Sequence, residues 1–206
     1  MINATVPMSY DRDDPVAHLA ELAEGFGLDG PGVGLLTGVD VTEVVARTDT
    51  GVRVWATVGL GVPIWAAAPA ERAPVERAPV PAAPERAPVP APSEHAPATA
   101  APGAGGHPVG TVNTVVYVPA RLSPAALINA VATATEAKAQ AIAELGMPGT
   151  GTPTDSVTVC CPTEGPEAPY GGPRSTWGAP LARAVHRAVL AGGARPVLPW
   201  SQQPAS

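Results

Sequence analysis

The sequence predicts an α/β fold, a single domain whose mixed β-sheet contains at least one parallel strand pair and is covered by helices. Two strand-like runs, 111–119 and 156–161, lie on either side of a long helix-like segment. A strand, helix, strand order of this length implies a right-handed crossover and therefore a parallel pair. Both runs are apolar at successive positions, which is typical of strands buried on both faces.

Three further apolar segments precede these runs, at 33–39, 42–47 and 52–60. Their β-branched residues indicate strands, and the TDTG break at 48–51 indicates a hairpin. The α/β domain is therefore expected to comprise residues 32–66 and 109–192, preceded by a partly helical N-terminal segment at 1–31 and followed by a tail at 193–206.

The helix between the two runs has clear ends. Ser123 is a good N-cap, Pro124 fits the first helical position, and Gly146 stops the helix. A spacing of 100° per residue puts one apolar stripe on the core side and one polar stripe opposite. The apolar stripe comprises Leu127, Val131, Thr135, Lys138, Ile142 and Leu145, and the polar stripe comprises Asn129, Thr133, Glu136 and Gln140.

Lys138 interrupts the apolar stripe, so it must either extend past the core or meet a charged partner. The polar stripe is either solvent-exposed surface or a polar site. A second helix, within 180–193, is amphipathic with Leu181, Val185 and Val189 on its inner side.

Residues 67–108 differ from the rest of the chain. Variants of the unit ERAPVPAAP repeat there, and they contribute much of a total of 27 prolines. Proline at this density prevents hydrogen-bonded structure, and too little apolar surface is present to offset the ordering entropy. The segment is predicted to be a disordered Pro/Ala/Glu/Arg insert.

Composition argues against several classes of function. A net charge of −6 provides no basic field for nucleic acid. Because no run approaches the roughly 20 apolar residues of a membrane span and no signal peptide begins the chain, a soluble, cytoplasmic protein is expected. No pattern of His, Cys and carboxylate residues predicts a metal site. A homo-oligomer is compatible with the sequence.

Two loops carry polar groups suited to a site. GMPGTGTPTDS at 146–156 could hold a carboxamide, a phosphate or an oxyanion, or could be an ordinary connection rich in turn residues. YGGPRSTWG at 170–178 contains Arg174, which could bind an acidic group or form a salt bridge. With His18 and His186 as the only histidines outside the insert, a hydrolase would use a carboxylate to activate water, or a Thr or Ser activated by Lys.

The segment GTVNTVVYVPARLSPAALINAVATATEAKAQAIAELG, together with TGTPTDSVTVCCP and YGGPRSTWGAPLARAV, resembles the adenosylcobinamide amidohydrolase (CbiZ) family of corrinoid salvage. The resemblance is strongest over 110–190 and extends to 32–66. It implies hydrolysis of the amide that joins the corrin side chain to 1-aminopropan-2-ol. No cofactor is expected, because the cobalt corrinoid is the substrate.

Taken with the resemblance, the helix and the two loops are expected to converge at one end of the sheet. Glu136 or Asp155 is the predicted general base, with Lys138 as its charge partner or as the stabiliser of the oxyanion. The alternatives are a non-catalytic corrinoid-binding module and an amidohydrolase acting on another carboxamide. The predicted substrate-binding residues are Asn113, Asn129, Thr133, Thr152, Thr154, Gly171, Gly172 and Arg174.

Overall fold

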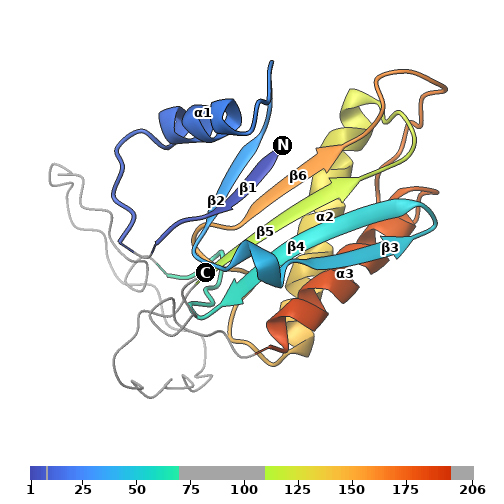
Figure 1. The fold of residues 1–206 in the computed structure, drawn as a ribbon. Helices are drawn as coiled ribbons and strands as arrows, with labels where there is room; N and C mark the ends of the chain where they lie inside the picture. Colours follow the sequence, from blue (N-terminus) through green and yellow to red (C-terminus); the bar gives the residue numbers. More distant parts are fainter. Residues whose placement is uncertain (8, 70–109, 196–206) are drawn as a thin grey trace, which may run out of the picture.

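The computed structural model describes residues 1–7, 9–69 and 110–195 (Figure 1). The predicted insert at 67–108, except for its first three residues, and the tail beyond residue 195 lie outside the described residues. The elements are β1 (Ile2–Thr5), α1 (Pro15–Gly25), β2 (Gly34–Thr37), a 3₁₀ turn (Val41–Glu43), β3 (Val45–Asp49), β4 (Val52–Leu60), β5 (Gly110–Tyr117), α2 (Pro124–Glu144), β6 (Ser156–Cys160) and α3 (Gly178–Gly193).

A four-stranded mixed sheet with the order β3-β4-β5-β6 is the centre of the fold. The β4 strand is antiparallel to both of its neighbours, β3 and β5, whereas β5 and β6 are parallel. Helices α2 and α3 cover one face of this sheet (Figure 1). The predicted α/β class, the hairpin and the parallel pair are therefore confirmed.

The other face of the sheet is covered by strands at one end instead of by helices. The β1 and β2 strands form a parallel two-stranded sheet. The side chain of Asn113 on β5 binds this small sheet to the central one. Asn113 Nδ2 donates to Asn3 Oδ1 at 3.0 Å and to the Leu36 carbonyl at 3.0 Å. No sequence pattern indicated β1, because its four residues, all half-buried, show neither alternation nor an apolar run.

The core consists mainly of valines from the sheet, alanines from α2 and the inner side of α3. Leu181, Val185 and Val189 are fully buried, as predicted. The prediction that the apolar stripe of α2 faces the core is correct only in part, because Lys138 and Ile142 are buried while Val131 and Thr135 are exposed. The helix instead turns its small residues inward, which lets it lie close to the sheet and to α3. These are Ala126, Ala130, Ala134, Ala137 and Ala141.

The β3–β4 hairpin is fastened to α3 through Asp49. Thr50 and Gly51 form its two-residue turn, both with positive φ (47° and 83°). The Asp49 carboxylate accepts hydrogen bonds from Arg183 and Arg187, at 2.7–3.0 Å. These bonds, from Arg183 above all, hold the pKa of Asp49 well below its ordinary value.

We expect Asp49→Asn to lower the free energy of unfolding by about 1 kcal/mol at pH 7, because the two arginines are half-exposed and partly screened. The folded-state pKa lies below the unfolded one, so this stabilisation is full above about pH 4 and is lost as the pH falls further. Urea unfolding at pH 7 and pH 3 tests this prediction. The advantage of the wild type over Asp49→Asn should be smaller at pH 3 than at pH 7, and an equal difference at both values would contradict it.

Candidate active site

A buried ion pair lies where β5 and β6 begin. Lys138 on α2 contacts Asp155, the last residue before β6, and their side chains are 8% and 11% exposed. Asp155 also accepts hydrogen bonds from the Val112 backbone N–H at 2.9 Å, and from the Thr152 backbone N–H at 3.0 Å and hydroxyl. The carboxylate thus joins the helix, the first residues of β5 and the preceding loop. Of the two arrangements expected for Lys138, the structure therefore shows the one in which it meets a charged partner.

Glycine at position 151 makes this arrangement possible. A Cβ atom at Gly151 would collide with both the Asp155 carboxylate and the Lys138 ammonium. The Gly151 carbonyl also accepts a hydrogen bond from the Ile64 N–H at 2.8 Å. The loop at 149–155 is therefore held between the ion pair and the segment that follows β4.

Hydroxyl and amide groups lie beside the pair on the strand-covered side of the sheet. The hydroxyls of Thr111 and Thr154 are 2.6 Å apart, and Thr154 is exposed. Asn113 is two residues along β5 from Thr111 and therefore on the same face. We call the set of Asn113, Lys138, Thr152, Thr154 and Asp155 the edge cluster.

The second loop binds α2 nearer the start of the helix. Thr133 donates from its hydroxyl to the Gly171 carbonyl at 2.9 Å. Gly172 packs so close to Asn129 that a Cβ atom there would lie 2.9 Å from Asn129 Oδ1. Arg174 is exposed. We call Asn129, Thr133, Gly171 and Gly172 the helix-start cluster.

The two clusters do not meet, so the expected convergence of the loops is wrong. Asn129 and Lys138 are nine residues apart on α2, which is about 14 Å along its axis. The loop at 149–155 leads into β6 and the loop at 170–178 follows it, so a strand separates them. The edge cluster also lies at the amino ends of β5 and β6, and not at the carboxyl ends where open α/β folds usually bind ligands.

Glu136 belongs to neither cluster. It is exposed and lines a cavity of about 400 Å³ between α2 and α3, together with Gln140, Arg183 and His186. Two residues on a helix differ by about 200° in direction, so Glu136 faces away from Lys138. The geometry therefore joins Lys138 with Asp155 and not with Glu136.

Three polar residues at the site were not singled out from the sequence. Asn3 Nδ2 donates to the hydroxyl of Thr57 at 3.3 Å, and Asn3 also binds Asn113. Thr111 could have been found, because strand alternation places it on the same face as Asn113. Asn3 and Thr57 could not, since their proximity depends on the packing of the small sheet.

Within residues 1–7, 9–69 and 110–195, no three His, Cys, Asp or Glu side chains are grouped so that they could hold a metal ion. Cys160 and Cys161 are free, half-buried thiols. None of the helices described here combines the length and the hydrophobicity that a membrane crossing requires.

An α/β domain with a buried lysine–carboxylate pair and hydroxyls at its sheet edge carries the polar groups that a hydrolase acting on polar bonds requires. A comparison with family models is more specific. Residues 1–197 match the model described as adenosylcobinamide amidohydrolase, and the chain belongs to this family, CbiZ, as the sequence motifs predicted.

Two curated relatives carry the same name. The protein from Methanosarcina mazei is 40% identical over 92 residues, which cover 40% of this chain and 46% of the relative. The protein from Halobacterium salinarum is 45% identical over 85 residues, which cover 41% of this chain and 36% of the relative. The chain thus spans less than half the length of each of these relatives. No solved structure matches the chain.

Proposed function

We propose that the protein hydrolyses the amide bond of adenosylcobinamide that joins the corrin side chain to 1-aminopropan-2-ol. The products are adenosylcobyric acid and 1-aminopropan-2-ol, and the reaction serves corrinoid salvage in the cytoplasm. Membership of the family supports the substrate. The buried Lys138–Asp155 pair, next to the exposed hydroxyl of Thr154, is the observation that supports the reaction.

In this proposal, water attacks the amide carbonyl carbon and Asp155 accepts the proton of that water. The Thr152 hydroxyl, which binds Asp155 in the free protein, rotates away to leave a carboxylate oxygen available. Lys138 stabilises the negative charge that develops on the carbonyl oxygen, and the proton then passes from Asp155 to the leaving amine. Glu136 is the alternative base, but it lies in the groove between α2 and α3.

Asn113 and Thr154 of the edge cluster are the proposed contacts to the carboxamides of the substrate. Asn113 Nδ2 is occupied by Asn3 and Leu36, so its carbonyl oxygen is the atom that we expect to contact substrate. The helix-start cluster and Arg174 stay in the proposal as more distant contacts to the same large ligand. The substrate brings its own cobalt, and the proposed reaction assigns the protein no further cofactor.

A second function has one observation in its favour. Asp155 accepts four hydrogen bonds, from Val112, from Lys138 and two from Thr152, which is about the full acceptor capacity of a carboxylate. A carboxylate held in this way could fix a binding surface without taking a proton. The protein would then be a corrinoid-binding module.

Release of 1-aminopropan-2-ol from adenosylcobinamide separates the two functions. We expect release by the wild type, and a decrease in kcat of roughly 100-fold or more in Asp155→Asn, because the amide cannot accept the proton. Glu136→Gln is the matched control, since it neutralises a carboxylate on the side of α2 that faces away from Lys138 and lines the cavity between α2 and α3. We expect its kcat to stay within about threefold of the wild type.

Circular dichroism of each variant shows whether it is folded under the assay conditions. If the folded wild-type protein binds the corrinoid but releases no 1-aminopropan-2-ol, the protein is a binding module. Loss of turnover in Glu136→Gln with normal turnover in Asp155→Asn would move the reaction to the groove between α2 and α3.

A further inference from the structure

The N-terminal helix α1 is well formed but buries none of its residues. Asp14 caps it by accepting from the Ala17 N–H at 2.9 Å, and Pro15 starts it. Leu19 holds it to the small sheet, so close to Gly34 that a Cβ atom there would collide with the leucine. A helix with these caps and so little buried surface leaves an apolar side without a partner.

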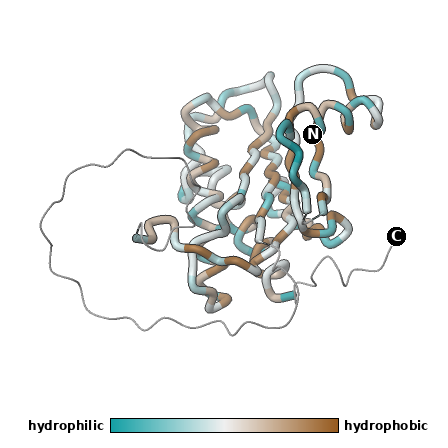
Figure 2. The backbone as a smooth tube through the Cα atoms, turned by 90° about the vertical axis from the view of Figure 1, so that its left-hand side faces the viewer, coloured by the Kyte–Doolittle hydropathy of each residue, from teal (hydrophilic) through white to brown (hydrophobic). Residues whose placement is uncertain are grey.

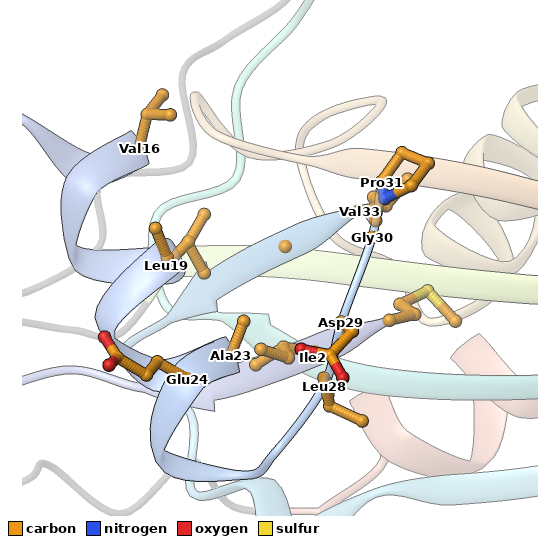
Figure 3. A pocket seen from close by; sticks show the side chains of 14 residues that line it. Ile2, Val16, Leu19, Ala23, Glu24, Leu28, Asp29, Gly30, Pro31 and Val33 are labelled. Atoms are coloured by element: carbon orange, nitrogen blue, oxygen red, sulfur yellow. The ribbon is translucent and has the colours of Figure 1, made fainter.

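The space between α1 and the small sheet is a cavity of about 700 Å³ (Figure 3). This volume lies within the range of roughly 300–1,000 Å³ that is common for ligand pockets. Val16, Leu28 and Val33 line it and are 45–75% exposed. Figure 3 shows these side chains around the cavity, with Leu19 and Ala23 extending from α1 toward β2.

The charged side chains of the cavity are acidic. They are Glu24 and Asp29, whereas Met1, which also lines the cavity, carries the N-terminal ammonium group. With two carboxylates and one ammonium, the balance of charge favours a cation. A second copy of this chain, which has a net charge of −6, is a poorer match for an acidic rim.

No residue of the edge cluster lines the cavity, but a smaller depression lies between the cavity and Asn113 of that cluster. Met1 lines it and at the same time lines a smaller depression of about 360 Å³ that contains Trp55 and Asn3. Asn3 is the residue that binds Asn113. A large ligand in the cavity can therefore extend across β1 to the amide groups at the sheet edge.

We propose that this cavity binds the cobalt-containing ring of the substrate. The inference rests on the proposed function, because it concerns the same ligand. A cobalt(III) ion, a corrin ring with one negative charge and a carbanionic adenosyl ligand together carry a net positive charge. The methyl groups of the ring match the valine and leucine walls, and the positive charge matches Glu24 and Asp29.

Binding is measured by stopped-flow quenching of tryptophan fluorescence on mixing with adenosylcobinamide, within seconds and before turnover. We expect Ala20→Phe, which fills the cavity from an exposed position on α1, to raise Kd at least about tenfold. Glu24→Gln/Asp29→Asn should raise Kd about fivefold and weaken its dependence on salt. The control Asp11→Asn/Asp13→Asn removes two exposed charges from a nearby segment outside the cavity and should leave Kd unchanged.

Wild-type Kd in both cavity variants would overturn the inference, as would failure of the wild type to bind adenosylcobinamide. A change of oligomeric state in Ala20→Phe, seen by light scattering, with unchanged Kd would assign the cavity to a second copy and also overturn it. Amide release is measured separately. Binding that depends on the cavity without release would refute the proposed reaction alone, and release that is independent of the cavity would refute this inference alone.

Discussion

Gly178→Ala is expected to lower the free energy of unfolding by about 3 kcal/mol, or to prevent folding. A Cβ atom at this first residue of α3 would collide with the carbonyl oxygens of Gly171 and Gly172. Both are backbone atoms, so relief requires the loop to move away from the start of α3. Ser175 fixes the same loop, because its hydroxyl donates to the Gly172 carbonyl at 2.8 Å and accepts from the Gly178 N–H at 3.0 Å.

Urea unfolding checks this prediction, with Gly25→Ala as the control. Gly25 ends α1 with ordinary φ and has no atom near the position of a new Cβ, so its substitution should change stability by less than about 0.5 kcal/mol. A Gly178→Ala protein as stable as the control would mean that the close approach of the loop to the start of α3 is not required. The loop could then not be said to fix the helix-start cluster.

Local signals made much of the fold predictable. Ser123, Pro124 and Gly146 fix the ends of α2, because capping and φ preferences act over one or two residues. The TDTG break works in the same way, since Thr50 and Gly51 adopt the positive φ of a tight hairpin turn. In such cases the information lies within the element itself.

The rotation of α2 about its own axis and the existence of β1 could not be predicted from such local signals. On α2 an apolar stripe competes with an alanine face, and the choice depends on how closely the sheet and α3 can approach. Asn3 becomes part of the site only because β1 pairs with β2 and lies against Asn113. These contacts join residues far apart in the chain.

The candidate site was predictable as two motifs but not as an arrangement. The periodicity placed Lys138 on the inner side of α2, where it had either to extend past the core or to meet a charged partner, and the structure shows the partner, Asp155. Periodicity also separated Lys138 from Glu136, which face different parts of the molecule. What the sequence did not indicate is that β6 keeps the two loops apart.

The Lys138–Asp155 pair is expected to show the largest energetic coupling in the fold. Lys138→Met should lower the free energy of unfolding by about 3 kcal/mol, because it leaves a buried carboxylate without its cation. Lys138→Met/Asp155→Asn should cost clearly less than the sum of the single changes, since the double variant has no uncompensated charge. Urea unfolding of the four proteins measures this coupling.

The Arg121–Glu167 pair provides the comparison, because both of its side chains are 43% exposed. Arg121→Met should change stability by less than about 1 kcal/mol, with coupling close to zero. If the Lys138 and Asp155 variants showed an equally small coupling energy, the ion pair would not be what holds Thr152 and the first residues of β5 in place. Strong coupling would instead mean that any kcat measured for Lys138→Met contains a structural part. In that case the Lys138→Met/Asp155→Asn protein, whose site has no buried charge, would be the proper reference for the contribution of the pair to catalysis.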